Sequence, residues 1–144
     1  MLRIQYYLLS FLSGGIWAVI AYILVKSHLL DATWGGVMAS PMIGLIIGIL
    51  FRRIMQCSFG WRAFLTLVSL YLSATLFAVA CGVHDAYFRG IANRDAIEVI
   101  GSSVFGVLYG LTLFGYFLFL WPLAYANHAL LARALPENAT YDSV

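Results

Sequence analysis

The chain has 144 residues, of which 63% are hydrophobic and only 10% are charged. Ordinary soluble domains are roughly 45–50% apolar and about 25% charged, and a chain this short has too little interior to bury so much apolar surface. The composition therefore excludes a water-soluble domain and predicts one domain embedded in lipid, and a net charge of +2 from dispersed basic residues argues against a nucleic-acid partner.

Charged residues are absent from four long stretches of the sequence. These stretches are residues 4–25, 32–51, 63–84 and 99–132. A helix needs about 20 apolar residues to cross a hydrocarbon core of about 30 Å, and it satisfies its backbone hydrogen bonds within one segment. Apolar runs of this length predict an all-α, polytopic integral membrane protein with four transmembrane helices in a single domain, residues 1–144.

The four transmembrane spans are expected at about 4–25, 34–51, 63–83 and 99–121. The first span is too long for the apolar part of a signal peptide and is expected to be retained. Pro41 lies close to the start of the second span, and we interpret it as part of an ordinary helix start. Pro122 is predicted to kink the chain after the fourth span. A short helix at the membrane interface, about 123–135, and a polar tail, 136–144, are expected to follow.

The basic residues lie unevenly on the two sides of the predicted bundle. One side carries Arg3, Arg52, Arg53, Arg62 and Arg133, and the other carries Lys26, Arg89 and Arg94. Because cytoplasmic loops are enriched in Lys and Arg, we predict that both termini are cytoplasmic (N-in/C-in), in a bacterial cytoplasmic (inner) membrane. Cys57 and Cys81 are expected near opposite surfaces, too far apart for a disulfide, and hence as free thiols.

Small residues recur at intervals of four in every predicted span. They are Ser10, Gly14 and Ala18 in the first span, Ser40, Gly44 and Gly48 in the second, Ala74, Ala78 and Gly82 in the third, and Ser102, Gly106 and Gly110 in the fourth. Such residues share one face of a helix, and in lipid they permit the close backbone approach on which helix association depends. We expect these faces to pack helices together, within the chain or against another subunit. A chance result of composition is the alternative.

Histidines are the side chains best suited to hold a cofactor. His28 and His84 are expected to end the first and third spans on the same side, where two imidazoles could ligate a haem iron and one could ligate the magnesium of a chlorin. Both also lie beside polar residues at the membrane rim, where a solvated histidine needs no special role. His128 lies beyond Pro122 and is expected at the interface. We therefore predict no cofactor and no metal, with haem or a chlorin as the alternative.

Catalytic chemistry has little support in the sequence. Four acidic residues fall in the predicted outer loops: Asp31, Asp85, Asp95 and Glu98. Proton and cation pathways instead place ionisable groups within the membrane. Ser58 lies in the run CSFG rather than in a nucleophile elbow. We therefore expect that the protein is not an enzyme and carries no titratable machinery at mid-depth.

The function favoured by these patterns is that of a non-catalytic accessory or structural subunit of a larger membrane complex. Such a subunit would pack against partner helices through its small residues and could also hold lipid or pigment. Two alternatives stay open: a small homo-oligomeric transporter or channel, and a haem- or chlorophyll-type cofactor-binding subunit. The expected partners are the lipid bilayer and other membrane-protein subunits.

Overall fold

The computed structural model describes residues 2–25, 33–88 and 118–134, and every regular element in these ranges is helical. In chain order the elements are α1 (Leu2–Val25), α2 (Thr33–Leu50), the 3-10 turn η1 (Ile54–Gln56), α3 (Phe59–Phe88), the 3-10 turn η2 (Leu118–Leu120) and α5 (Trp121–Ala132). The predicted all-α class is therefore confirmed for the described residues.

Three of these helices are long and apolar enough to cross a membrane. The candidate spans are Ile4–Ile23, Trp34–Gln56 and Phe59–His84. They coincide with the first three predicted spans, and they give the chain the character of an integral membrane protein. The predicted fourth span, 99–121, lies almost entirely outside the described residues.

Two helices differ from their predicted bounds. α3 begins before and ends after the predicted range 63–83, because that prediction stopped the span near charged residues. A helical backbone does not require apolar side chains, and the long stem of Arg62 can carry its charge toward the interface. α5 begins at Trp121 and has Pro122 in its first turn, where the missing N–H costs no intrahelical hydrogen bond.

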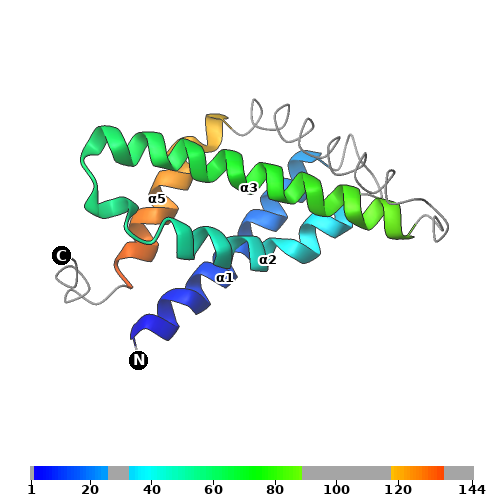
Figure 1. The fold of residues 1–144 in the computed structure, drawn as a ribbon, viewed down its shortest axis with the longest axis horizontal. Helices are drawn as coiled ribbons and strands as arrows, with labels where there is room; N and C mark the ends of the chain where they lie inside the picture. The colour runs from blue at the N-terminus through cyan, green and yellow to red at the C-terminus, as the bar shows by residue number, and fades with distance from the viewer. Residues whose placement is uncertain (1, 26–32, 89–117, 135–144) are drawn as a thin grey trace.

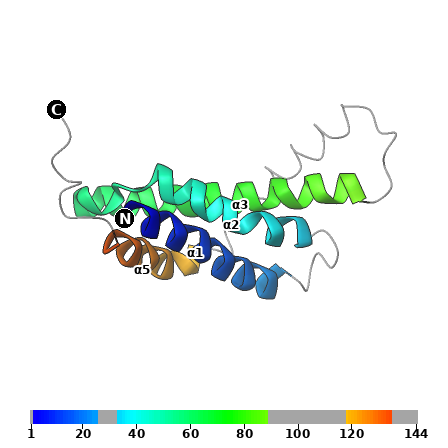
Figure 2. The same ribbon diagram turned by 90° about the horizontal axis from the view of Figure 1, so that it is seen from below.

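The helices form two layers that pack face to face. α2 and α3 are joined by η1 at one end and run antiparallel (Figure 1). α1 and α5 lie on one side of the layer that α2 and α3 form (Figure 2). α1 packs mainly against α2, and α5 contacts both α1 and α3.

Along α1, large apolar side chains point outward and small or polar side chains point into the bundle. The outward stripe consists of Ile4, Leu8, Leu12, Ile16, Val19 and Ile23, each more than half exposed. The buried stripe includes Tyr6, Ser10, Ser13, Ala18 and Ala21. In water an apolar face of this length would be a liability, whereas in lipid the large side chains are solvated and the small ones permit close helix contact. This arrangement supports a lipid-facing α1.

α1 and α2 cross where two glycines face each other. A Cβ atom added to Gly44 would lie 2.6 Å from the Cα atom of Gly14. A Cβ atom added to Gly14 would lie 2.9 Å from the Cα atom of Pro41 and still closer to the carbonyl oxygen of Ser40. The two backbones are therefore in direct contact, with no room for a side chain at either position.

The same contact continues one turn later in α2 and one turn earlier in α1. A Cβ atom added to Gly48 would overlap the side chain of Ser10. The Tyr6 hydroxyl donates a hydrogen bond of 2.7 Å to the carbonyl oxygen of Gly48, and Ser10 donates one of 2.9 Å to the carbonyl oxygen of Tyr6. A backbone carbonyl on α2 is thus bonded to a side chain of α1, which fixes the register of the two helices.

Pro41 lies in the interior of α2, so the interpretation of this residue as a helix start was wrong. α2 begins at Thr33, about two turns earlier. Because proline has no N–H, the carbonyl of Val37 lacks its usual partner four residues on. The Ser40 hydroxyl donates to the carbonyl oxygen of Gly36 at 2.7 Å. The turns before Pro41 pack closely against α3, where a Cβ atom added to Gly36 would meet the Phe77 ring.

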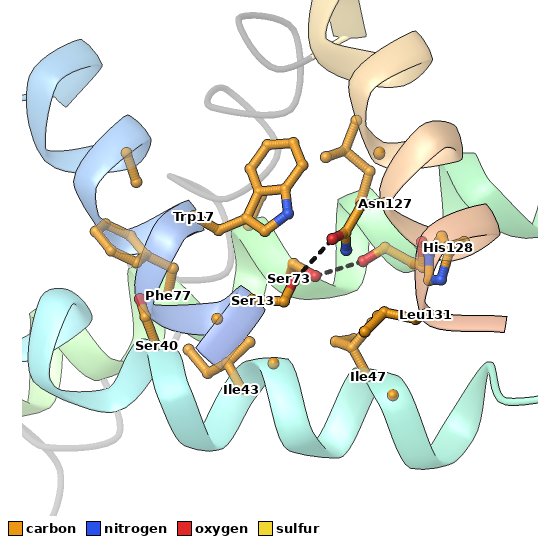
Figure 3. A pocket seen from close by; sticks show the side chains of 18 residues that line it. Ser13, Trp17, Ser40, Ile43, Ile47, Ser73, Phe77, Asn127, His128 and Leu131 are labelled. Atoms are coloured by element: carbon orange, nitrogen blue, oxygen red, sulfur yellow. Dashed lines mark hydrogen bonds between the residues drawn. The ribbon is translucent and has the colours of Figure 1, made fainter. Parts of the chain in front are cut away.

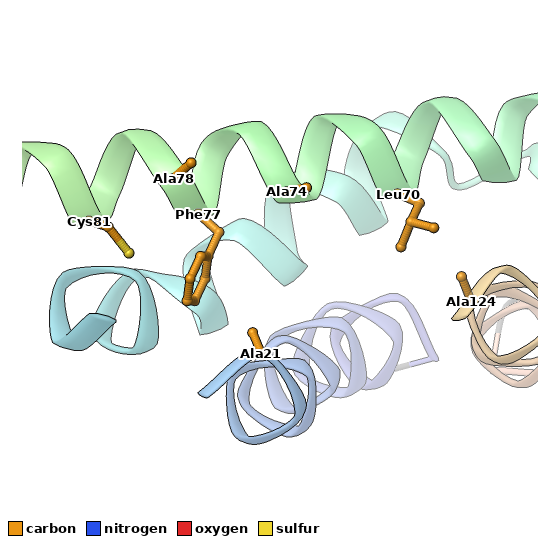
Figure 4. Close-up of a cluster of buried hydrophobic side chains, with 7 residues drawn as sticks. All are labelled: Ala21, Leu70, Ala74, Phe77, Ala78, Cys81 and Ala124. Carbon is orange, nitrogen blue, oxygen red and sulfur yellow. The ribbon is translucent and has the colours of Figure 1, made fainter. Parts of the chain in front are cut away.

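The apolar core between the layers is made mostly of small side chains. Its buried residues are Ala21, Leu70, Ala74, Phe77, Ala78, Cys81 and Ala124 (Figure 4). Phe77 is the one aromatic side chain among them, and a Cβ atom added to Gly36 of α2 would lie 2.6 Å from its ring. The glycine therefore makes the space that the phenyl ring occupies.

Candidate binding site between the helices

A cavity of about 90 Å³ lies between α1, α2, α3 and α5 (Figure 3). Its apolar walls include Trp17, Ile43, Ile47, Leu70, Phe77 and Leu131. Its polar lining consists of Ser13, Ser40, Ser69, Ser73, Asn127 and His128. The cavity is thus apolar over most of its surface, with polar groups contributed by all four helices.

The cavity lies near the middle of the three candidate spans. Ser13 of α1, Gly44 of α2 and Leu70 of α3 line it, and each lies close to the midpoint of its own span. Hydrocarbon offers no hydrogen bonds to a polar group at this depth. Partners for such groups must come from the protein, from trapped water or from a ligand.

The first polar pair joins α1 to α5. Ser13 Oγ donates a hydrogen bond of 3.0 Å to Asn127 Oδ1. The amide nitrogen of Asn127 carries two further donors, and no described residue accepts a hydrogen bond from it. If the amide were turned round, its oxygen would be left over instead. One end of the Asn127 amide therefore lacks a partner among the described residues in either orientation.

The second polar pair joins α3 to α5. Ser69 Oγ lies 2.8 Å from Nε2 of His128, and these side chains are 1% and 6% exposed. Ser69 Oγ also donates to the carbonyl oxygen of Thr66 at 2.8 Å. A hydroxyl has a single proton, so Nε2–H of His128 is the donor in its bond to Ser69. Nδ1 of the neutral ring then carries a lone pair, for which the described residues supply no donor.

The other two lining serines are satisfied within their own helices. Ser73 Oγ donates to the carbonyl oxygen of Ser69 at 2.7 Å, and Ser40 Oγ donates to that of Gly36. Such bonds to the preceding turn leave only the acceptor lone pairs of a hydroxyl available. The unsatisfied hydrogen-bonding capacity of the cavity is therefore concentrated on two neighbouring residues of α5, Asn127 and His128.

The histidines named from the sequence as cofactor ligands do not line this cavity. His28 lies outside the described residues. His84 is half-buried toward the far end of α3, and its Cβ atom lies against Gly35 of α2. Within the described ranges, no three His, Cys, Asp or Glu side chains group together in a way that could hold a metal ion. The cavity nevertheless presents one imidazole, that of His128.

The predicted packing residues are placed as follows. Ser10, Gly14, Ala18, Ser40, Gly44 and Gly48 lie in α1 and α2, and all of them except Ala18 meet at the crossing. Ala74 and Ala78 of α3 are buried in the apolar core, whereas Gly82 is half-buried. Ser102, Gly106 and Gly110 of the predicted fourth span lie outside the described residues. The structure therefore brings the first two sets into mutual contact within the chain.

Sequence reasoning missed the importance of Asn127 and His128. The structure buries the His128 side chain against Ser69, with its ring centroid 6.2 Å from that of Phe51, whereas the place of α5 at a membrane interface stays a prediction. An ionisable side chain therefore does occur inside the bundle. Two adjacent polar residues within the otherwise apolar run after Pro122 were the available signal.

Comparison with known proteins finds no matching family model, no matching curated protein and no matching solved structure. The class that fold and site define is an integral membrane protein of apolar helices with a mostly apolar interhelical cavity that carries a few polar side chains.

Proposed function

We propose that this protein binds a small uncharged solute in the cavity between α1, α2, α3 and α5. One observation carries the proposal: Asn127 and His128 each turn a hydrogen-bonding atom toward no described partner, within an otherwise apolar cavity near the middle of the spans. Neither free atom is fully enclosed, because Thr75 Oγ1 is the buried side-chain atom without a partner among the described residues. A bound molecule with hydrogen-bonding groups can therefore reach Asn127 and His128 and satisfy both.

The absence of charge in the described lining supports an uncharged ligand. No Lys, Arg, Asp or Glu lines the cavity among these residues. An ion placed in such surroundings would lack the paired charge that it needs to offset its desolvation. Ser13, Asn127 and His128 offer neutral donors and acceptors, which suit amides, alcohols and water.

The size of the cavity limits the ligand further. An engineered protein cavity of about 150 Å³ binds benzene, and about 10–15 Å³ holds one water molecule. A volume of about 90 Å³ therefore suits a molecule smaller than benzene or a cluster of a few waters. This volume favours a small solute over a haem or chlorin, and a small-solute carrier or channel is the function that we propose from it.

Thermal unfolding of the purified protein in detergent tests this proposal with a matched pair of solutes. Acetamide and acetate have nearly the same shape, but only acetamide is uncharged. At ten times its dissociation constant, a ligand adds about 1.4 kcal/mol of stability, and we expect acetamide to raise Tm by roughly 3 °C on that basis. Acetate is expected to leave Tm unchanged, and benzamide is expected to be excluded by its size.

Asn127→Leu keeps a similar side-chain volume and removes the amide, so acetamide should no longer raise Tm in this variant. Ser58→Ala, in the exposed turn before α3, serves as a control that keeps the wild-type response. Equal effects of acetamide on the wild type and on Asn127→Leu would overturn the proposal, as would equal effects of acetamide and acetate. Uptake of acetamide by proteoliposomes then separates transport from binding alone.

The accessory-subunit function stays a prediction, because no structural observation bears on a partner. If the protein is an accessory subunit, other subunits should co-purify with it in stoichiometric amounts in mild detergent. If it is a transporter or channel of this size, it should instead purify as a discrete homo-oligomer. An absorption spectrum of the same sample tests the cofactor-binding alternative.

We further propose the finer membrane arrangement that the sequence predicts. It comprises a fourth span at about 99–121, both termini in the cytoplasm, and a bacterial inner membrane. The distribution of basic residues between the two ends of the helices supports this orientation. Reporter fusions at the two termini and in the loop between the third and fourth predicted spans are expected to place only the loop on the periplasmic side.

A further inference from the structure

Four arginines lie at one end of the bundle. Arg52 and Arg53 follow α2, Arg62 lies in the first turn of α3, and Arg133 follows α5. The end of α2, the start of α3 and the end of α5 lie at the same end of the molecule in both views (Figures 1 and 2), and α5 contacts η1. The four positive charges therefore gather around the turn between α2 and α3.

The described side chains at this end include no carboxylate that could neutralise the arginines. The acidic residues of the chain are Asp31, Asp85, Asp95, Glu98, Glu137 and Asp142, and none of their side chains is among those described. The described part of this end thus carries four positive charges and no negative ones. Such a surface attracts anions, and it does so most strongly where the neighbouring medium is apolar.

The arginines are held partly by the fold and keep most of their donors available. Arg62 donates from Nε to the carbonyl oxygen of Cys57 at 2.6 Å, and Arg52 donates from an Nη atom to the Tyr7 hydroxyl at 3.5 Å. Arg53 is exposed. A guanidinium group has five N–H donors in a planar fork that matches the oxygens of a phosphate, so these contacts leave capacity for an anionic ligand.

Exposed aromatic side chains mark the same end as a membrane boundary. Phe59, Trp61 and Phe64 of α3 are 70%, 61% and 55% exposed. Trp61 and Phe64 pack edge to face with ring centroids 5.7 Å apart. Trp and Tyr side chains concentrate at the level of lipid headgroups, so Trp61 is the residue that marks the boundary. The arginines beside them therefore lie where the phosphates of a bilayer are found.

We propose that this end of the bundle binds the phosphate groups of anionic phospholipids through Arg52, Arg53, Arg62 and Arg133. Charge complementarity and the adjoining aromatic side chains select a lipid headgroup as the occupant. The proposal is independent of the cavity and of any solute bound there.

Native mass spectrometry with titrated lipid tests this proposal on the full chain. We expect phosphatidylglycerol to bind at least twenty-five-fold more tightly than phosphatidylcholine of the same chain length, because two or more arginines contribute about five-fold each. A basic residue near an anionic surface contributes about five-fold to binding, so Arg53→Gln should weaken phosphatidylglycerol binding by that factor. Arg53→Gln/Arg133→Gln should weaken it by roughly twenty-five-fold. Both side chains are exposed, so their loss should leave Tm in detergent unchanged.

Two matched controls accompany these variants. Gln56→Ala, an exposed uncharged position in the same turn, and Arg53→Lys, which keeps the charge, should retain at least half of the wild-type preference. Equal binding of the two lipids would overturn the proposal, as would an undiminished preference in the double variant. Inorganic phosphate that displaces phosphatidylglycerol at equal concentration would assign the site to free phosphate and overturn the lipid assignment.

Discussion

The contact between α1 and α2 and the contacts of α5 with its neighbours follow different physical rules. At the crossing of α1 and α2, Gly14 and Gly44 bring the backbones together and leave no space between them. Around α5, Asn127 and His128 reach across to serines on α1 and α3, and a cavity remains beside them. The first contact is dense and specified by the absence of side chains, whereas the second is open and specified by hydrogen bonds.

Both contacts border the candidate site, because Gly14 and Gly44 of the crossing and Asn127 and His128 of α5 all line the cavity. Dense packing of small residues supplies van der Waals contact along the whole crossing, which stabilises helix association in lipid. Polar pairs beside a cavity contribute less stability, because an interhelical hydrogen bond in a membrane is worth about 0.6 kcal/mol on average. Substitutions at the crossing of α1 and α2 should therefore lower the stability of the protein more than substitutions in the polar pairs of α5.

The largest effect is expected for Gly14→Leu. The added side chain would meet the backbone of Ser40 and Pro41, which cannot move aside as a flexible side chain would. Overpacking a well-packed core costs about 1–3 kcal/mol and occasionally more, so we expect a loss of about 3 kcal/mol or failure to fold, measured by thermal unfolding in detergent. Gly15→Leu is the matched control, because a Cβ atom at Gly15 meets nothing within 4 Å. Equal losses in both variants would contradict the assignment of the crossing.

Gly44→Leu tests the same contact from the other helix. A Cβ atom there would lie 2.6 Å from three backbone atoms, the Cα and N of Gly14 and the carbonyl oxygen of Ser10. We expect a loss of about 2–3 kcal/mol together with weaker retention of any partner subunits. Co-purification of all partners in wild-type amounts, with an unchanged Tm, would contradict a packing role for this face.

A smaller effect is expected for Ser69→Ala. The change leaves Nε2–H of His128 buried without its acceptor, which costs about 1–2 kcal/mol. Ser73→Ala is the control on the next turn, because the Ser73 hydroxyl bonds only to its own helix, and its loss should stay within about 0.5 kcal/mol. A double-mutant cycle with His128→Phe should yield a coupling energy for the Ser69–His128 pair, and a value of zero would exclude the hydrogen bond.

Ser13→Ala should have a still smaller effect on stability, about 0.6 kcal/mol, the average for an interhelical hydrogen bond in a membrane. Asn127 is only half-buried, so its freed amide can turn toward water or a ligand in the cavity. Thermal unfolding measures the loss, and a double-mutant cycle with Asn127→Ala assigns it to the pair. A loss of stability above about 2 kcal/mol would contradict the view that the polar contacts of α5 contribute less stability than the crossing of α1 and α2.

The smallest effect is expected outside both contacts. His28→Ala and His84→Ala should leave the visible absorption spectrum of the purified protein unchanged, because we predict that neither histidine holds a pigment. His84 lies at the far end of α3 from the cavity, against Gly35. Loss of an absorption band in either variant would overturn that prediction.

Charge-free stretches in the sequence were enough to predict where α1, α2 and α3 lie. The cost of placing a charge or an unpaired backbone group in hydrocarbon keeps the middle of each span free of charge, although arginines occur near the ends of the second and third candidate spans. The small residues at intervals of four also indicated which faces permit close contact, because the spacing of a helix repeats regularly. Gly14 and Gly44 were therefore named as packing positions before the partner of either glycine was known.

The candidate site depended on tertiary structure. Ser13 and Asn127 are 114 residues apart, and Ser69 and His128 are 59 apart, so no local pattern in the sequence relates them. Pro41 was misinterpreted for a different reason, because the second span was already predicted to begin near residue 34, which places the proline about two turns inside α2. Hydropathy is a property of each segment and decides which helices enter lipid. The way those helices pack decides which polar side chains share a cavity.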